Sequence, residues 1–143
     1  MMASAPRVRG ILETSVYVAD LDRAHTFYGG IVGLERMVGG ERLFVYDAAP
    51  GEALLVFLRG ATAEDVPTDG GVIPGHHSEG PGHFAFKVAK SDLDQWRAHF
   101  AQAGVPIVSE VTWPAGGVSI YVNDPDGNVV EFAAPALWPN YQE

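Results

Sequence analysis

A short motif that occurs twice limits the possible folds of this chain more than any other feature of the sequence. The run Val18-Ala19-Asp20-Leu21-Asp22 returns about seventy residues later as Val88-Ala89, two inserted residues and Asp92-Leu93-Asp94. A repeat of this spacing indicates two structural units of the same kind, each too small to close a hydrophobic core by itself. The chain is therefore expected to pair two similar halves.

Each copy of the motif lies between a strand-like segment and a helix-like segment. The strands before the two copies are predicted at residues 14–18 and 84–88. Three further strands are predicted after each helix, at residues 34–38, 42–46 and 53–58 in the first half and at residues 106–111, 117–122 and 128–133 in the second. The order of elements in each half is thus βαβββ.

Residues at the helix ends support this order. Asp20 is placed to cap the first helix, and the glycine pair at positions 29 and 30 is expected to end it. Ser91 and Asp94 have the spacing of a capping box for the second helix, and Gly104 is its expected stop.

The length and hydrophobic content fit one domain. With 143 residues, of which 47% are hydrophobic, the chain can bury one sizeable core. We predict a single α+β domain over residues 1–143, in which module one (about residues 8–60) and module two (about residues 82–135) form a curved mixed sheet around a central cleft. The Gly- and Pro-rich residues 61–81 are predicted to be a linker or lid without regular structure.

Charge and composition exclude several classes of function. The 9 basic residues stand against 18 acidic ones, a net charge of -9 that disfavours binding to nucleic acid or an anionic membrane. The absence of cysteine leaves imidazole and oxygen as the ligands for any metal ion. No run is apolar enough for a signal peptide or a membrane span, so a cytoplasmic protein is expected.

Strand alternation selects the side chains that line the cleft. Apolar residues at every second position face the helices, so Glu13, His83 and Glu131 point to the opposite surface from three different strands. Glu131 is the strongest clue, because a carboxylate on an otherwise apolar strand needs a cation or a proton.

Three motifs together resemble the vicinal oxygen chelate superfamily of glyoxalases, extradiol dioxygenases and bleomycin and fosfomycin resistance proteins. The first is the Val18–Asp22 run with Phe27-Tyr28 and Gly33-Leu34, the second is Gly82–Phe86, and the third is Asp124–Glu131. The resemblance covers nearly the whole chain. It is specific for the superfamily and not for any one activity.

The resemblance implies a divalent metal ion, with Mn, Fe, Ni, Zn and Mg as candidates. It places Glu13 and His83 at the ligand positions of the first strands and Glu131 at that of the final strand. Glu13 departs from the common pattern, which has histidine or glutamine there, and the fourth position falls on the apolar Leu55 or Phe57. It also implies a homodimer. Some members of the family build each site from two chains, whereas the three ligands of this sequence could come from one chain, and both arrangements stay open.

The expected activity is that of a lyase or isomerase. A metal ion held by these ligands would chelate a small oxygenated substrate and promote proton abstraction next to a carbonyl, with Glu131 or Glu13 as the base. One imidazole and two carboxylates differ from the two-histidine set of iron oxygenases, which makes an extradiol-type dioxygenase a weaker alternative. Another alternative is a metal-free protein that binds or sequesters a small molecule.

Further residues are candidates for the substrate pocket. Tyr17, Phe57, Trp113 and Tyr121 are proposed to contact the substrate, and the pair His76-His77 is proposed as part of a lid. The Asp124–Gly127 run is predicted to be a structural turn.

Overall fold

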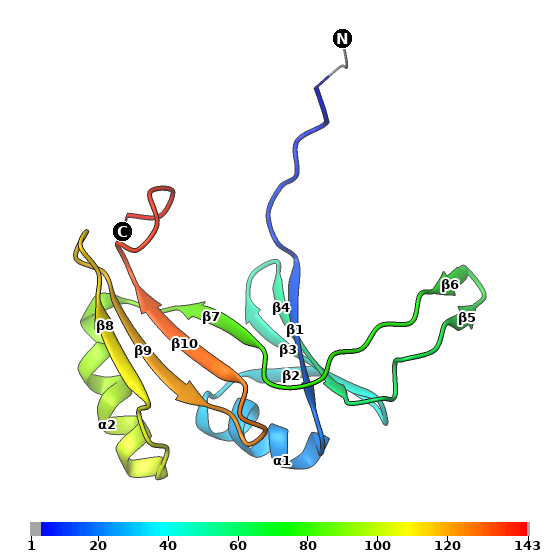
Figure 1. Cartoon of the computed structure of the whole chain (residues 1–143), viewed down its shortest axis with the longest axis horizontal. Helices are drawn as coiled ribbons and strands as arrows, with labels where there is room; N and C mark the ends of the chain where they lie inside the picture. The colour runs from blue at the N-terminus through cyan, green and yellow to red at the C-terminus, as the bar shows by residue number, and fades with distance from the viewer. Residues whose placement is uncertain (1–3, 143) are drawn as a thin grey trace.

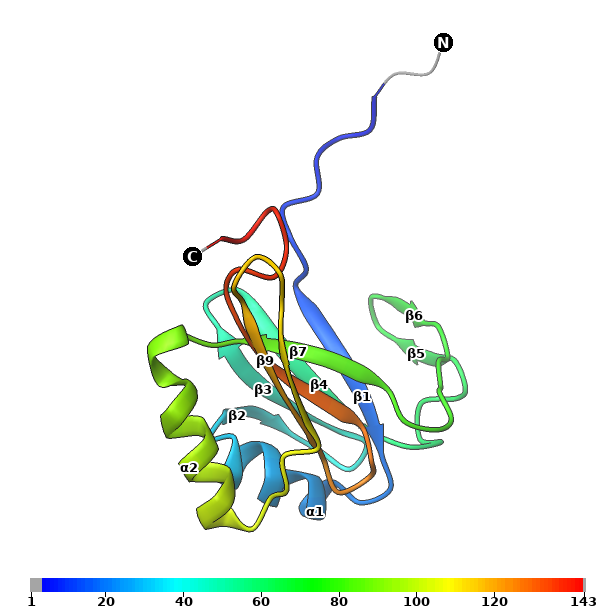
Figure 2. The same ribbon diagram turned by 60° about the vertical axis from the view of Figure 1, so that its left-hand side comes forward.

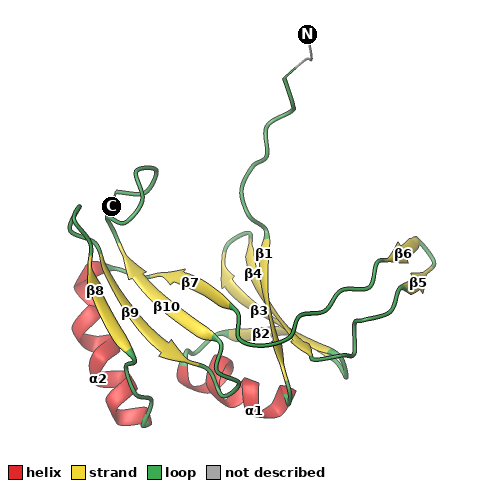
Figure 3. Ribbon diagram, in the orientation of Figure 1, coloured by secondary structure: helices red, strands yellow, loops and turns green. Residues whose placement is uncertain are grey.

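Two four-stranded sheets stand side by side and share one layer of helices (Figures 1 and 3). The structure is a computed structural model that describes residues 4–142. The predicted domain also included residues 1–3 and 143, which lie outside the described residues. The arrangement confirms the predicted α+β fold of two βαβββ units.

The elements follow the predicted order. The first unit contains β1 (Glu13–Val18), α1 (Leu21–His25), the π-helical turn η1 (Thr26–Ile31), β2 (Glu35–Gly39), β3 (Leu43–Ala49) and β4 (Glu52–Leu58). The second contains β7 (His83–Lys87), the 3₁₀ turn η2 (Lys90–Asp92), α2 (Leu93–Ala103), β8 (Ser109–Thr112), β9 (Val118–Asn123) and β10 (Val129–Ala134).

The two sheets have the same topology. Their strand orders are β1-β4-β3-β2 and β7-β10-β9-β8, and in each sheet the first and last strands of the unit pair in parallel. The registers are also equivalent. Ser15, two residues after Glu13, pairs with Leu55, while Ala85, two residues after His83, pairs with Glu131. Leu55 is therefore the residue of the first unit that corresponds to Glu131.

The first helix begins as predicted but ends differently. Asp20 accepts a hydrogen bond from the Arg23 backbone nitrogen, which confirms it as the cap. The glycine pair does not end the helix, because η1 continues through it to Ile31. Packing explains this difference: a β-carbon on Gly29 would lie 2.4 Å from the His25 ring, which is stacked on Tyr46. The glycine serves close packing rather than helix termination.

The second helix lacks the predicted capping box. η2 precedes α2, and the residue before the helix, Asp92, makes no capping hydrogen bond with its side chain. Asp94 instead pairs with Arg97, with 2.6 Å between Oδ1 and Nη1. The predicted stop is confirmed, because Gly104 has a φ of 71°, a left-handed conformation that favours glycine.

The segment between the units contains a hairpin that the sequence pattern did not predict. β5 (Val66–Thr68) pairs with β6 (Gly71–Ile73), and the hairpin projects from the body of the protein (Figure 2). Strands of three residues are too short to show an alternating apolar pattern. The segment returns to the body at His76, whose backbone exchanges two hydrogen bonds of 2.8 Å with Thr62.

A buried polar cluster joins the two units. The Tyr28 hydroxyl donates to Asp124 Oδ2 at 2.7 Å, and the Asn128 side chain donates to the same oxygen at 2.8 Å. Asp126 accepts hydrogen bonds of 2.9 Å from the Ala19 backbone and the Arg23 guanidinium. The Asp124–Gly127 run is thus a turn, as predicted, and it fixes the second unit to the β1–α1 corner of the first. The surrounding apolar core is continuous across both units.

The neighbouring strands β1 and β7 run in opposite directions (Figure 1). Glu13 and Thr14, at the start of β1, line the same groove as residues 84–87 of β7. At the other end, the Tyr17 carbonyl accepts a 3.4 Å hydrogen bond from Asn128. That side chain also accepts one of 2.7 Å from the Gly82 backbone. Equivalent positions of the two strands therefore lie at opposite ends of their junction.

Neither helix in the described part of the chain has the length and apolar character needed to cross a membrane.

Candidate functional site

His83 and Glu131 form the centre of the candidate site. The first residue of β7 and the middle of β10 bring His83 Nε2 within 3.3 Å of Glu131 Oε1. The imidazole side chain is 53% exposed, whereas the carboxylate is 7% exposed. A ligand can thus approach the imidazole from solvent, and the buried carboxylate forms the floor of the site.

The hydrogen-bonding partner of Nδ1 shows that this nitrogen of the His83 ring carries a hydrogen. Nδ1 lies 3.0 Å from the carbonyl oxygen of Val129. A carbonyl only accepts hydrogen bonds, so Nδ1 carries a hydrogen, and Nε2 is the ring nitrogen that faces Glu131. An imidazole lone pair and a carboxylate at this distance repel each other unless a cation or a proton lies between them.

A chain of hydrogen bonds holds the far side of the carboxylate. The fully buried Ser119 hydroxyl donates to Glu131 Oε2, and Trp113 Nε1 donates to the Ser119 oxygen at 2.9 Å. The indole has a single N–H, so this direction is fixed. The chain orients Glu131 so that its other oxygen, Oε1, faces His83.

An aromatic wall lies beside the pair. Tyr121 pairs with Glu131 across β9 and β10, and its ring is stacked on the His83 ring with 6.2 Å between the centroids. Burial raises the pKa of Tyr121, and the negative charge of Glu131 raises it further. The phenol therefore stays neutral and can donate a hydrogen bond. Of the four predicted pocket residues, Tyr121 is beside the pair, and Trp113 is connected to it through Ser119.

Glu13 does not join this pair within one chain. Among residues 4–142, no group of three or more His, Cys, Asp or Glu side chains is placed to hold a metal ion. The direction of the strands gives the reason: β1 and β7 run in opposite directions, so Glu13, the first residue of β1, and His83, the first residue of β7, lie at opposite ends of the junction. Alternation predicts which face of the sheet each residue occupies. It does not predict which ends of two strands lie next to each other.

The other predicted pocket residues gather on the first unit. Tyr17 and Phe57 are stacked, and the His76 ring contacts both of them, with a 2.5 Å hydrogen bond between Nδ1 and the Tyr17 hydroxyl. His76 thus attaches the segment between the units to the end of β1. The neighbouring His77 is exposed and forms no hydrogen bond with other described side chains. The lid role of both histidines stays a prediction.

Ser119 is the residue of the site that the sequence interpretation missed. Alternation places it on the same face as Tyr121, opposite the buried Ile120 and Val122. The signal in the sequence that could have identified Ser119 is a serine in an apolar strand, two residues from a predicted pocket residue. Hydroxyls are frequent on half-buried strands, so this signal is a weak one.

The pair fits a divalent metal ion as two donors of a larger set. An ion bound at the usual distances by an imidazole nitrogen and a carboxylate oxygen keeps these atoms roughly 3 to 3.4 Å apart. The observed 3.3 Å lies in this range. The hydrogen bond from Nδ1 to a backbone carbonyl is also the partner that metal-binding histidines usually have. The described residues of one chain do not add a third ligand.

Comparison with known proteins identifies the class that has this fold. The family model of the Glyoxalase/Bleomycin resistance protein/Dioxygenase superfamily matches residues 10–132. The chain belongs to this superfamily.

Solved structures agree with this assignment. The crystal structure of lactoylglutathione lyase from Agrobacterium tumefaciens is similar, with 32% sequence identity, a TM-score of 0.85, and 94% of this chain and 99% of that chain covered. An integron cassette protein from the mobile metagenome of the Halifax Harbour sewage outfall has 22% identity and a TM-score of 0.71, covering 90% and 100% of the two chains. A glyoxalase/dioxygenase from Nostoc punctiforme has 21% identity and a TM-score of 0.65, covering 94% and 100%. The last two show the fold alone.

Proposed function

We propose that this protein is a glyoxalase-type lyase or isomerase whose His83 and Glu131 bind a divalent metal ion. The observation that carries the proposal is the 3.3 Å distance between His83 Nε2 and Glu131 Oε1, an arrangement that needs a cation or a proton between the two groups. When bound, a metal ion supplies Lewis acidity that stabilises negative charge developing on a substrate oxygen. The similarity to a lactoylglutathione lyase at 32% identity supports this reaction class.

The protein's own residues orient and enclose the reacting groups. Ser119 and Trp113 fix the rotamer of Glu131, and the Val129 carbonyl fixes the ring of His83. Tyr121 covers one side of the imidazole, and its neutral hydroxyl can donate to an oxygen of the substrate. These contacts preorganise the site for a small oxygenated substrate with an acidic hydrogen next to a carbonyl.

We further propose that Glu13 completes the site from a second copy of the chain. Glu13 is exposed and has no hydrogen-bonding partner for its side chain among the described residues. In a homodimer, Glu13 of one protomer would approach His83 and Glu131 of its partner. It would serve there as the third ligand or as the base that removes the proton.

Metal analysis of protein purified without chelators tests the proposal. Native protein should contain metal in stoichiometric amount, and Glu131→Gln should lose most of it, while the exposed Glu41→Gln should keep it. Native protein should also form lactoylglutathione, the compound in the name of the similar lyase, or carry out a related isomerisation. Metal-free native protein, or unchanged metal content in Glu131→Gln, would refute the metal site.

A metal-free binding protein is the second candidate. The hydrogen bond from Ser119 satisfies one oxygen of Glu131 without any metal, and a proton shared with His83 satisfies the other. In that case the aromatic wall would hold a basic or hydrogen-bonding small molecule. A native protein that contains no metal but is stabilised against heat by such a ligand would favour this candidate.

A further inference from the structure

Equivalent positions of the two sheets carry side chains of opposite chemistry. In the second unit, Glu131 pairs with Tyr121 across β10 and β9. The equivalent residues of the first unit are Leu55 and Val45, which pair with each other across β4 and β3. Both are apolar and half-buried. The first unit therefore has a hydrophobic surface at the place where the second unit has the polar groups of the candidate site.

Glu13 lies on the same face of the first sheet as this hydrophobic surface. Side chains at every second position of a strand share a face, so Glu13, Ser15 and Tyr17 point to one side of the sheet. Ser15 is the residue of β1 that pairs with Leu55. Glu13 precedes Ser15 by two residues and lies roughly 7 Å from it along the strand. A molecule that contacts the Glu13 carboxylate is therefore next to the hydrophobic surface.

Three aromatic rings lie at the other end of this face. Phe57 pairs with Tyr17 on β1 and with Leu43 on β3. The Tyr17 and Phe57 rings are stacked with 5.5 Å between their centroids, and the centroid of the His76 ring lies 4.7 Å from that of Phe57. Tyr17 follows Glu13 by four residues. The face thus changes from acidic to aromatic over roughly 13 Å along the strand.

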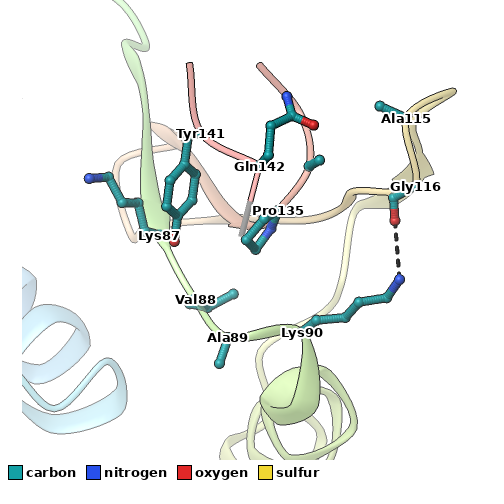
Figure 4. Close-up of a pocket in the computed structure, with 10 residues that line it drawn as sticks. Lys87, Val88, Ala89, Lys90, Ala115, Gly116, Pro135, Tyr141 and Gln142 are labelled. Atoms are coloured by element: carbon teal, nitrogen blue, oxygen red, sulfur yellow. Dashed lines mark hydrogen bonds between the residues drawn. The ribbon is translucent and has the colours of Figure 1, made fainter. Parts of the chain in front are cut away.

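The second unit has no such aromatic end among its equivalent positions. Lys87 occupies the position equivalent to Tyr17. Its ammonium lies 5.1 Å from the centroid of the Tyr141 ring, which belongs to the C-terminal segment (Figure 4). Ala133 occupies the position equivalent to Phe57. The aromatic end is therefore a property of the first unit and not of the repeated fold.

The face of the first unit offers no positive charge to an anionic group. Ala53 pairs with Glu13 on one side and with Asp47 on the other. Over the described positions of β1, β4 and β3 on this face, the charged side chains are these two acids, and Lys and Arg are absent. An anion would be repelled here, whereas an apolar group would be removed from water.

We infer that this face binds an uncharged apolar group of the substrate, whose oxygenated part lies at the metal ion. The inference rests on the proposed function, in which Glu13 reaches His83 and Glu131 of a second copy of the chain. Leu55 and Val45 contact the apolar group, and the three aromatic rings lie beyond it. The substrate class is thus a small carbonyl compound with an alkyl or aromatic substituent.

Two hydroxamates test this inference on protein loaded with Mn²⁺, because the hydroxamate group chelates divalent metal ions through its oxygens. Acetohydroxamate has a methyl group beside the chelating group, and benzohydroxamate has a phenyl group. Isothermal titration calorimetry measures the Kd of each for native protein, Leu55→Ala and Val45→Thr. Val72→Thr is the matched control, because it makes the same change at an exposed valine of the β5–β6 hairpin. Circular dichroism verifies that the variants are folded.

Native protein should bind benzohydroxamate at least about tenfold more tightly than acetohydroxamate, because the phenyl group is removed from water on this face. Leu55→Ala and Val45→Thr should each weaken benzohydroxamate binding at least about threefold and leave acetohydroxamate binding within about twofold of native protein. Val72→Thr should bind both probes as native protein does.

The results separate this inference from the proposed metal site. Native protein that holds no metal ion refutes both. The inference alone is overturned if metal-loaded native protein binds benzohydroxamate no more tightly than acetohydroxamate. It is also overturned if both face variants keep the native preference, or if Val72→Thr loses the preference to the same extent.

Discussion

The Ser119 hydroxyl donates a hydrogen bond to the same carboxylate of Glu131 that faces His83. Ser119 is fully buried, and it is also the acceptor for the indole nitrogen of Trp113. Three side chains on β9, β10 and the β8–β9 turn are thus connected in one line that ends at the candidate metal ligands. The position of Glu131 Oε1 depends on each of them.

We expect Ser119→Ala to weaken both the fold and the site. The substitution leaves Glu131 Oε2 and Trp113 Nε1 without a protein partner, which should lower the free energy of unfolding by about 1–3 kcal/mol. Loss of the residue that orients a metal ligand typically reduces metal affinity by about 10- to 100-fold. Urea unfolding and a metal-competition titration measure the two effects.

Ser15→Ala is the matched control, because Ser15 is an exposed serine on β1. It should change the free energy of unfolding by less than about 0.5 kcal/mol. If Ser119→Ala leaves metal affinity unchanged while lowering stability, Ser119 supports the fold but does not position Glu131 for a metal ion.

Complementation between two variants tests whether Glu13 acts across a dimer. Glu13→Gln and Glu131→Gln homodimers should each bind metal poorly. A mixed dimer of the two chains should regain one intact site, formed by Glu13 from one chain with His83 and Glu131 from the other. Mixed dimers purified through two different tags, with metal content measured on them, give the result.

The outcome separates the two arrangements. Sites formed within one chain would not be repaired by mixing, because each chain lacks one ligand. Mixed dimers as poor in metal as the parent variants would therefore show that Glu13 does not act across the interface. A monomer in sedimentation velocity would exclude the shared site directly.

Most of the fold could be predicted because its signals are local and occur twice. Asp20 and Gly104 mark helix ends through their own backbone chemistry, and alternation in β1, β7 and β10 gives the correct buried faces. The Gly29 position was misread, because a glycine required by the neighbouring His25 ring resembles one that ends a helix. Local patterns do not distinguish these two reasons for a glycine.

Less of the site could be predicted because it depends on how separate strands meet. Register within a sheet brought His83 and Glu131 together as expected. The placement of β1 beside β7, which separates Glu13 from them, involves contacts such as that of Asn128 with the Tyr17 carbonyl, 111 residues apart in sequence. Periodicity carries no information on such a contact.

Two adjacent glycines in η1 should respond in opposite ways to alanine. Gly29→Ala brings a β-carbon 2.4 Å from the His25 ring, whose Nδ1 is 2.8 Å from the Tyr46 hydroxyl. Displacing this ring should cost about 1–3 kcal/mol of unfolding free energy. Gly30→Ala meets no atom within 4 Å and should be neutral or stabilising by up to about 1 kcal/mol.

Thermal or urea unfolding of the two variants gives the comparison. The pair controls for helix propensity, because both glycines lie in the same turn. Equal effects of the two substitutions would show that the His25 ring moves aside without cost, and would contradict the packing reason given for Gly29.

Stability should fall at alkaline pH through Tyr28. Burial, and then the negative charge of Asp124, raise the pKa of Tyr28 well above its ordinary value of 10.0. Below about pH 10 the phenol is protonated in both the folded and the unfolded chain, so it adds no pH dependence. Above about pH 10 the unfolded chain loses this proton and the folded chain keeps it. The free energy of unfolding should then fall by up to about 1.4 kcal/mol per pH unit for this group.

Tyr28→Phe identifies the contribution of this residue. The variant should be less stable at pH 7, because Asp124 loses a buried hydrogen bond, but its stability should fall less steeply between pH 10 and about pH 11. Tyr141→Phe is the matched control, because it removes the same hydroxyl from an exposed tyrosine. Urea unfolding at several pH values measures the slopes. A slope for Tyr28→Phe equal to that of native protein would mean that other groups, such as Tyr46 and Tyr121, whose pKa values are also raised by burial, cause the alkaline loss.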